Sequence, residues 1–202
     1  MGPRQILLIR HGETDGGSSV RYFGSTDVEL SEDGREQMAK IGAQLASRRV
    51  DLWVASNLRR SWQAAGILSR GALVRIEPDF REIHFGQWEG LTREEIQARD
   101  PVAFEDWQAG RDGFEYPAGE SRAAFRARVG RGLERVLASP AANVAAVLHK
   151  GVIREIARQL TGEPLTADHP QLAGITVVTR VAEGPWLVGQ RSSDPAPLSV
   201  MV

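Results

Sequence analysis

The feature that most constrains this chain is a short apolar run near its start that ends in charged residues. Residues 6–9 read Ile-Leu-Leu-Ile and are followed by Arg10, His11 and Gly12. A run this brief cannot form an amphipathic helix and is typical of a strand buried in a parallel sheet. In open α/β sheets the carboxyl ends of strands face the ligand crevice. We therefore expect Arg10 and His11 at a candidate site, although the same residues also fit a loop without a chemical role.

Further short apolar runs alternate with helical patterns along the rest of the chain. The predicted strands lie at about 51–55, 73–76, 143–148, 175–179 and 186–188, and the predicted helices at about 32–48, 56–67, 122–139 and 151–160. Ser31 is a suitable N-cap for the first helix, and Gly162 a suitable C-cap for the last. The pattern predicts one three-layer α/β domain over residues 1–202, with a mostly parallel central sheet and helices on both faces.

Three stretches without this regular alternation are expected beside the sheet. Residues 15–30 are rich in Gly and Ser and predict a loop long enough to lie over a pocket, and residues 80–90 predict a structured loop. A small helical insertion is expected at about 90–119, where Thr92 and Glu95 form a capping box and Pro101 ends the first helix. The large aromatic residues are expected to be core rather than substrate platforms: Trp88, Phe104, Trp107 and Phe125.

Composition excludes several classes of function. The chain has 202 residues, 42% of them hydrophobic, which suits one core. A net charge of -1 provides no overall field for nucleic acid or an anionic membrane. The absence of cysteine excludes disulfides and thiolate metal sites. The apolar runs are too short for a signal sequence or a membrane span, so we expect a soluble cytoplasmic protein, monomeric or homodimeric.

Charged and polar residues gather where the predicted strands end. Arg10, His11, Arg60, Glu82 and His149 all follow strands and are expected to converge on one crevice. Two arginines and two histidines suit a dianion such as a phosphoryl group. A metal site is the competing interpretation, but the arginines would repel a divalent cation, so no metal and no cofactor are expected. Glu82 could instead form a surface ion pair with Arg81, and Arg59 and Arg60 could extend into solvent.

Five motifs together resemble the histidine phosphatase superfamily, in its phosphoglycerate mutase-like branch. They span most of the chain in the order of the family: Arg10-His-Gly-Glu-Thr, Ser56-Asn-Leu-Arg-Arg, Arg81-Glu-Ile-His-Phe-Gly-Gln-Trp-Glu-Gly, Gly119-Glu-Ser and His149-Lys-Gly-Val-Ile-Arg. The resemblance implies that His11 accepts the phosphoryl group covalently. It also implies a phosphate pocket of Arg10, His11, Arg60 and His149, with Glu82 as proton donor.

Some positions depart from the pattern of the family. Gly16 and Gly17 stand where an Asn is frequent, and the segment after Arg60 reads Ser61-Trp-Gln-Ala64 in place of the more usual Ala and Thr. Lys150 replaces the first glycine of a usual Gly-Gly pair. The side chain of Lys150 either turns inward and favours substrates with a second anionic group, or extends to solvent.

The resemblance implies a metal-independent phosphomonoesterase that hydrolyses a small-molecule phosphate ester through a phosphohistidine. Two alternatives remain, a cofactor-dependent phosphoglycerate mutase and a non-catalytic binder of phosphorylated ligands. A mutase must exclude water, and the Gly- and Ser-rich loop 15–30 is expected to be too mobile for that. Candidate substrate contacts are Arg21, Tyr22, Gly24, His84 and Lys150, although His84 also fits an ordinary loop residue.

Overall fold

A computed structural model of the protein describes residues 2–166, 168–182 and 184–192. The tail with Pro195 and Pro197, which we expected to be surface-bound or disordered, lies outside these ranges. The strands are β1 (Gln5–Arg10), β2 (Leu52–Ala55), β3 (Val74–Ile76), β4 (Asn143–Leu148), β5 (Ile175–Arg180) and β6 (Trp186–Ser192). The helices are α1 (Glu32–Gln44), α2 (Arg59–Ser69), α3 (Arg93–Arg99), α4 (Pro101–Gln108), α5 (Arg122–Leu137) and α6 (Lys150–Thr161), with 3₁₀ turns at Pro78–Phe80 and Gly86–Trp88.

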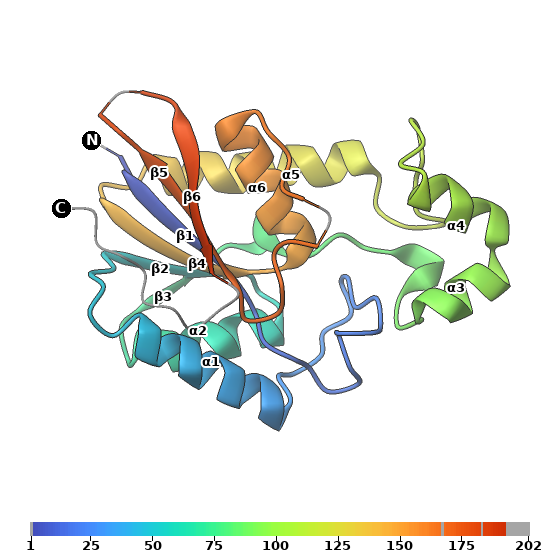
Figure 1. Ribbon diagram of the computed structural model, residues 1–202, viewed down its shortest axis with the longest axis horizontal. Helices are drawn as coiled ribbons and strands as arrows, with labels where there is room; N and C mark the ends of the chain where they lie inside the picture. The colour runs from blue at the N-terminus through green and yellow to red at the C-terminus, as the bar shows by residue number, and fades with distance from the viewer. Residues whose placement is uncertain (1, 167, 183, 193–202) are drawn as a thin grey trace.

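The six strands form one sheet in the order β3-β2-β4-β1-β5-β6. Strands β3, β2, β4 and β1 are parallel, whereas β5 pairs antiparallel with both β1 and β6. Helices α5 and α6 cover one face and α1 and α2 the other, which gives three layers (Figure 1). The prediction of a mostly parallel three-layer α/β fold is therefore confirmed.

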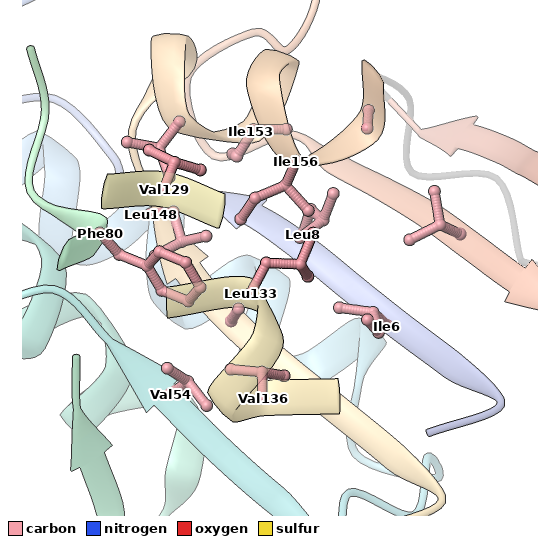
Figure 2. Close-up of a cluster of buried hydrophobic side chains, with 14 of the residues drawn as sticks. Ile6, Leu8, Val54, Phe80, Val129, Leu133, Val136, Leu148, Ile153 and Ile156 are labelled. Atoms are coloured by element: carbon pink, nitrogen blue, oxygen red, sulfur yellow. The ribbon is translucent and has the colours of Figure 1, made fainter. Parts of the chain in front are cut away.

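Alternating side chains of β1 build two cores. Ile6 and Leu8 point to the face covered by α5 and α6, where they join a cluster with Phe80, Val129 and Ile153 (Figure 2). Leu7 and Ile9 belong to the cluster on the opposite face. All four side chains are at most 3% exposed. A strand buried on both faces needs an unbroken apolar run, and this explains the sequence of residues 6–9.

The helix boundaries differ in two places from those that the sequence predicts. Helix α1 ends at Gln44 and not at residue 48, because after Leu45 the N–H groups bond to carbonyls three residues back, as Ala46 does to Ala43 (3.3 Å) and Arg48 to Leu45 (2.9 Å). Helix α2 begins at Arg59 and not at Ser56, whose hydroxyl accepts a bond from the N–H of Leu58 (3.2 Å) instead of capping the helix.

The insertion carries its own small core. Thr92 and Glu95 form the predicted capping box, and Pro101 opens α4 as its first residue. Trp88, Ile96, Phe104 and Phe114 are buried together, and α3 and α4 stand apart from the two helical layers (Figure 1). Burial of Trp88, Phe104 and Phe125 confirms that they are core, whereas Trp107 is only partly buried. No helix in the described part of the chain is long and apolar enough to cross a membrane.

Candidate active site

The two histidines meet because the strands that precede them are neighbours. Arg10 pairs with Leu148 in the parallel register of β1 and β4, so His11 and His149 follow at the same edge of the sheet. The His11 N–H donates to the Leu148 carbonyl (3.1 Å), and the two imidazole rings lie 5.2 Å apart between centroids. Both side chains are buried.

A backbone carbonyl orients the His11 ring. Nδ1 of His11 lies 2.7 Å from the carbonyl oxygen of Gly12, which can only accept, so Nδ1 carries the proton and Nε2 keeps a free lone pair. Burial, followed by the charges of Arg60 and Arg10, lowers the pKa of His11 well below its usual value. The ring is therefore neutral. Gly12 permits this packing, because a Cβ there would lie 2.5 Å from the carbonyl oxygen of Gly34.

The buried Arg60 side chain joins His149 to the loop before α1. Its Nε donates to Nδ1 of His149 (3.3 Å), while its terminal nitrogens donate to the carbonyls of Phe23 (3.0 Å), Gly24 (2.6 Å) and Thr26 (2.7 Å). Burial lowers the pKa of Arg60 to about 10, which still leaves it charged at neutral pH.

Hydrogen bonds fix the tautomer of His149 as well. Because Nδ1 of His149 accepts from Arg60, Nε2 of the neutral ring donates to Oγ of Ser56 (2.7 Å). Burial, then the charge of Arg60, lowers the pKa of His149 well below its usual value. Ser61 in turn accepts from the Ser56 N–H (2.8 Å) and donates to the Val147 carbonyl (2.6 Å). Ser61, one of the departures from the family pattern, thus supports this part of the pocket.

Arg10 and Glu82 complete the group that the sequence analysis brought together. Arg10 donates through Nη1 to the Pro170 carbonyl (3.0 Å), while its buried Nε has no hydrogen-bond partner among the residues that the structure describes. The Glu82 carboxylate is 5% exposed and accepts from the N–H groups of Ile83 (2.9 Å) and Gly151 (2.8 Å). Glu82 is therefore buried beside Gly151 and is not a surface partner of Arg81.

An arginine that the sequence reasoning did not single out holds the backbone of Glu82. Arg128 on α5 donates to the carbonyls of Asp79 (2.8 Å), Arg81 (2.6 Å) and Glu82 (3.0 Å). Its charge is balanced by two bonds of 2.7 Å to the carboxylate of Glu120, in the Gly119-Glu-Ser motif. The only signal in the sequence was a charged residue on the apolar face of a predicted helix.

Glu89 was also missed, and it changes the interpretation of loop 15–30. Its carboxylate accepts from the N–H groups of Gly24 (3.1 Å), Ser25 (2.9 Å) and Thr26 (3.2 Å). Arg60 donates to carbonyl groups of the same segment, so residues 23–26 are held both through their N–H groups, by Glu89, and through their carbonyls, by Arg60. The expectation of a mobile loop, which rested on composition, does not match this bonding.

The candidate substrate contacts lie in different surroundings. Arg21 forms an ion pair with Glu95 (2.9 Å) in the insertion, and Tyr22 packs among the aromatic rings of the same region. Gly24 contacts Arg60, whereas His84 is exposed and accepts from the Gly86 N–H (2.8 Å). Lys150 follows His149 directly and is half-buried. Gly24 and Lys150 are thus beside the pocket, while Arg21 is directed toward the insertion.

The described residues contain no group of three or more His, Cys, Asp or Glu side chains that could hold a metal ion. The arrangement instead offers a neutral imidazole nucleophile beside two guanidinium groups and one carboxylate. These are the groups needed to bind a phosphoryl dianion, accept it and exchange a proton with its leaving oxygen.

Comparison with known families settles the family of the chain. The sequence profile of the histidine phosphatase superfamily (branch 1) matches residues 6–192. The chain belongs to this superfamily. The glucosyl-3-phosphoglycerate phosphatase of Mycobacterium tuberculosis is 35% identical over 187 residues, which cover 87% of this chain and 82% of that protein.

Solved structures agree with this assignment. A mycobacterial glucosyl-3-phosphoglycerate phosphatase superposes with a TM-score of 0.77 at 32% identity, covering 92% of this chain and 97% of the other. The α-ribazole phosphatase of Shigella flexneri has a TM-score of 0.81 over 97% of this chain and 99% of the other. At 24% identity, the latter supports the fold alone.

Proposed function

We propose that this phosphomonoesterase transfers the phosphoryl group of a small phosphate ester to Nε2 of His11 and then to water, without a metal ion. One observation carries the proposal: the bond from Nδ1 to the Gly12 carbonyl leaves a lone pair on Nε2. The lowered pKa of His11 keeps that lone pair free of a proton at neutral pH. A nucleophile of this kind needs no activating base.

Fixed cationic donors support binding of the phosphoryl group. Arg10 offers its unpaired Nε, and the charges of Arg10 and Arg60 both act on His11. His149 is neutral and both of its ring nitrogens are engaged by Arg60 and Ser56, so it packs against the His11 ring without adding a further donor. Preorganised donors of this type stabilise the charge spread over the transferring oxygens.

Glu82 is the proton carrier in both steps. As the P–O bond breaks and the bond to Nε2 forms, the carboxyl group of Glu82 gives its proton to the leaving alkoxide. In the second step the carboxylate takes a proton from water, whose oxygen bonds to phosphorus as the N–P bond breaks. The contacts to Ile83 and Gly151 hold the carboxylate in one orientation for this exchange.

The substrate is proposed to be a small-molecule phosphate ester. The name of a relative supports this class, because glucosyl-3-phosphoglycerate is a small organic phosphate. The polar groups around His11 are individual side chains that follow strand ends at one edge of the sheet, which suits a compact ligand.

Trapping the phosphoenzyme tests the proposal. After brief incubation with a radiolabelled substrate and a quench in base, we expect an acid-labile, alkali-stable label on the wild type and none on His11→Ala. Lys40→Ala, an exposed change on α1, is expected to retain the label. A full label on His11→Ala would refute the assignment. Loss of wild-type turnover in EDTA, with recovery on addition of a divalent metal, would refute metal independence.

A further inference from the structure

Three cationic side chains gather next to the proposed phosphate pocket, on the side of α6. Lys150 is the first residue of α6 and Arg154 lies one turn later, so their side chains share a face of the helix. Arg10 ends β1 beside them. The guanidinium groups of Arg10 and Arg154 repel the Lys150 ammonium, while Asp168 and Glu82 attract it. The first turn of α6 adjoins the pocket, because the N–H of Gly151, the residue after Lys150, donates to the Glu82 carboxylate (2.8 Å).

The ammonium of Lys150 has no partner in direct contact within the described part of the protein. Its ammonium forms no hydrogen bond and no ion pair with a described residue, and Arg154 reaches only the Leu165 carbonyl at 3.5 Å. Elsewhere, a more deeply buried cation is matched, as Arg128 is by Glu120 at 2.7 Å. The first turn of α6 contains no acidic residue.

This arrangement is unfavourable for the free protein. Like charges four residues apart on a helix repel each other, and a cation in the first helical turn opposes the helix dipole. Burial of half of the Lys150 side chain, together with Arg10 and Arg154, lowers its pKa. A lysine without a binding role could extend fully into water and avoid part of this electrostatic and desolvation cost. An anion placed between Lys150 and Arg154 would remove it.

We propose that Lys150, together with Arg154, binds a second anionic group of the substrate, a carboxylate or a further phosphate carried by the leaving alcohol. The proposal rests on the proposed function, since it places the ester phosphate at His11. Glu82 must contact the leaving oxygen, and the same carboxylate acts on Lys150. The second anion is therefore part of the alcohol and not of the transferred group. Lys150 then accounts for a preference for doubly anionic esters.

A matched pair of esters tests the proposal. The two esters are 3-phosphoglycerate, which carries a carboxylate, and glycerol 3-phosphate, which carries a neutral hydroxymethyl group in its place. Each is measured as a substrate and as a competitor of 4-nitrophenyl phosphate hydrolysis, so that binding is obtained even where turnover is slow. In Lys150→Gln we expect the KM or inhibition constant of 3-phosphoglycerate to rise about tenfold, as for loss of a charge-assisted hydrogen bond. The value for glycerol 3-phosphate is expected to change less than about twofold.

Controls separate charge recognition from a structural effect. Lys150→Arg is expected to restore the preference for 3-phosphoglycerate, and Lys40→Gln, the same change at an exposed site on α1, to leave both constants unaltered. A fructose 1,6-bisphosphate and fructose 6-phosphate pair tells whether the second group is a phosphate. The proposal would be overturned if Lys150→Gln changed the constants of both members of each pair equally. It would also be overturned if the wild type showed no preference for the doubly anionic ester. Absence of 4-nitrophenyl phosphate hydrolysis by the wild type would instead overturn the proposed function.

Discussion

Replacing Gly151 by alanine should separate catalysis from stability. The Gly151 N–H holds Oε2 of Glu82 at 2.8 Å, and a Cβ on Gly151 would lie 2.5 Å from Oε1. Nonbonded atoms do not approach this closely, so the carboxylate must leave its position. Gly151 is the second residue of α6, and alanine is favoured over glycine in a helix by at most about 1 kcal/mol. The substitution therefore stabilises the helix while it displaces the carboxylate of Glu82, the proposed proton carrier.

The magnitude follows from the displacement. A misplacement of about 1 Å costs about 100-fold in rate, and loss of a positioned acid about 10²- to 10⁴-fold. For Gly151→Ala we expect kcat with an alkyl phosphate to fall about 100-fold. With 4-nitrophenyl phosphate the loss is expected to be smaller, because nitrophenolate leaves without a proton. The free energy of unfolding should stay within about 1 kcal/mol of wild type, since the helical gain offsets the clash.

The assay combines steady-state kinetics on both esters with urea unfolding. Gly66→Ala is the matched control, because Gly66 lies within α2 and a Cβ there meets no atom within 4 Å. It should stabilise the fold by about 1 kcal/mol without changing either rate. Full activity of Gly151→Ala on the alkyl phosphate, or an equal loss on both esters, would refute the reasoning about Glu82.

Three further predictions address the pocket as a whole. Folding lowers the pKa of His11 and of His149, so the unfolded chain binds more protons as the pH falls. The free energy of unfolding should therefore decrease below about pH 6.5, by up to about 1.4 kcal/mol per pH unit for each histidine. An unfolding free energy in urea that stays constant from pH 6.5 to 5 would contradict this. Arg128→Met removes the partner of the partly exposed Glu120 and should cost about 1.5–3 kcal/mol in unfolding free energy, whereas a loss under about 1 kcal/mol would show that the pair is dispensable. With 3-phosphoglycerate and a bisphosphorylated primer, free phosphate should exceed isomerised product, and isomerisation that outran phosphate release would identify a mutase.

The sequence predicted those features that depend on local pattern. The apolar run of β1 specified a strand buried on both faces, and the helical periodicity specified the layers around it. The site residues were located because parallel strands end at one edge of the sheet, so that Arg10, His11 and His149 converge from separate segments. The boundary of α1 was wrong, because Leu45 continues the apolar stripe although the chain has already turned.

Features that depend on contacts between distant segments could not be derived in this way. Loop 15–30 looked mobile because Gly and Ser are abundant, yet its N–H groups are bound by Glu89 from a segment more than sixty residues later. The orientation of His11 depends on where the Gly12 carbonyl points, and no sequence pattern encodes that direction. The sequence does not distinguish Arg128 from the other arginines of α5, because its role depends on its hydrogen bonds to the carbonyls of Asp79 and Glu82 in a distant segment.

The buried Nε of Arg10 has no hydrogen-bond partner among the described residues, and this has a consequence for the enzyme after each turnover. A donor left without an acceptor is satisfied by a tetrahedral oxyanion, and inorganic phosphate is also the product of the reaction. Phosphate at about 100 times its dissociation constant would raise the unfolding free energy by about 2.7 kcal/mol. The same occupancy would keep new substrate away from His11. With phosphate bound as proposed, product inhibition and thermal protection would be one binding event, and the protein would be hardest to unfold when it is least able to turn over.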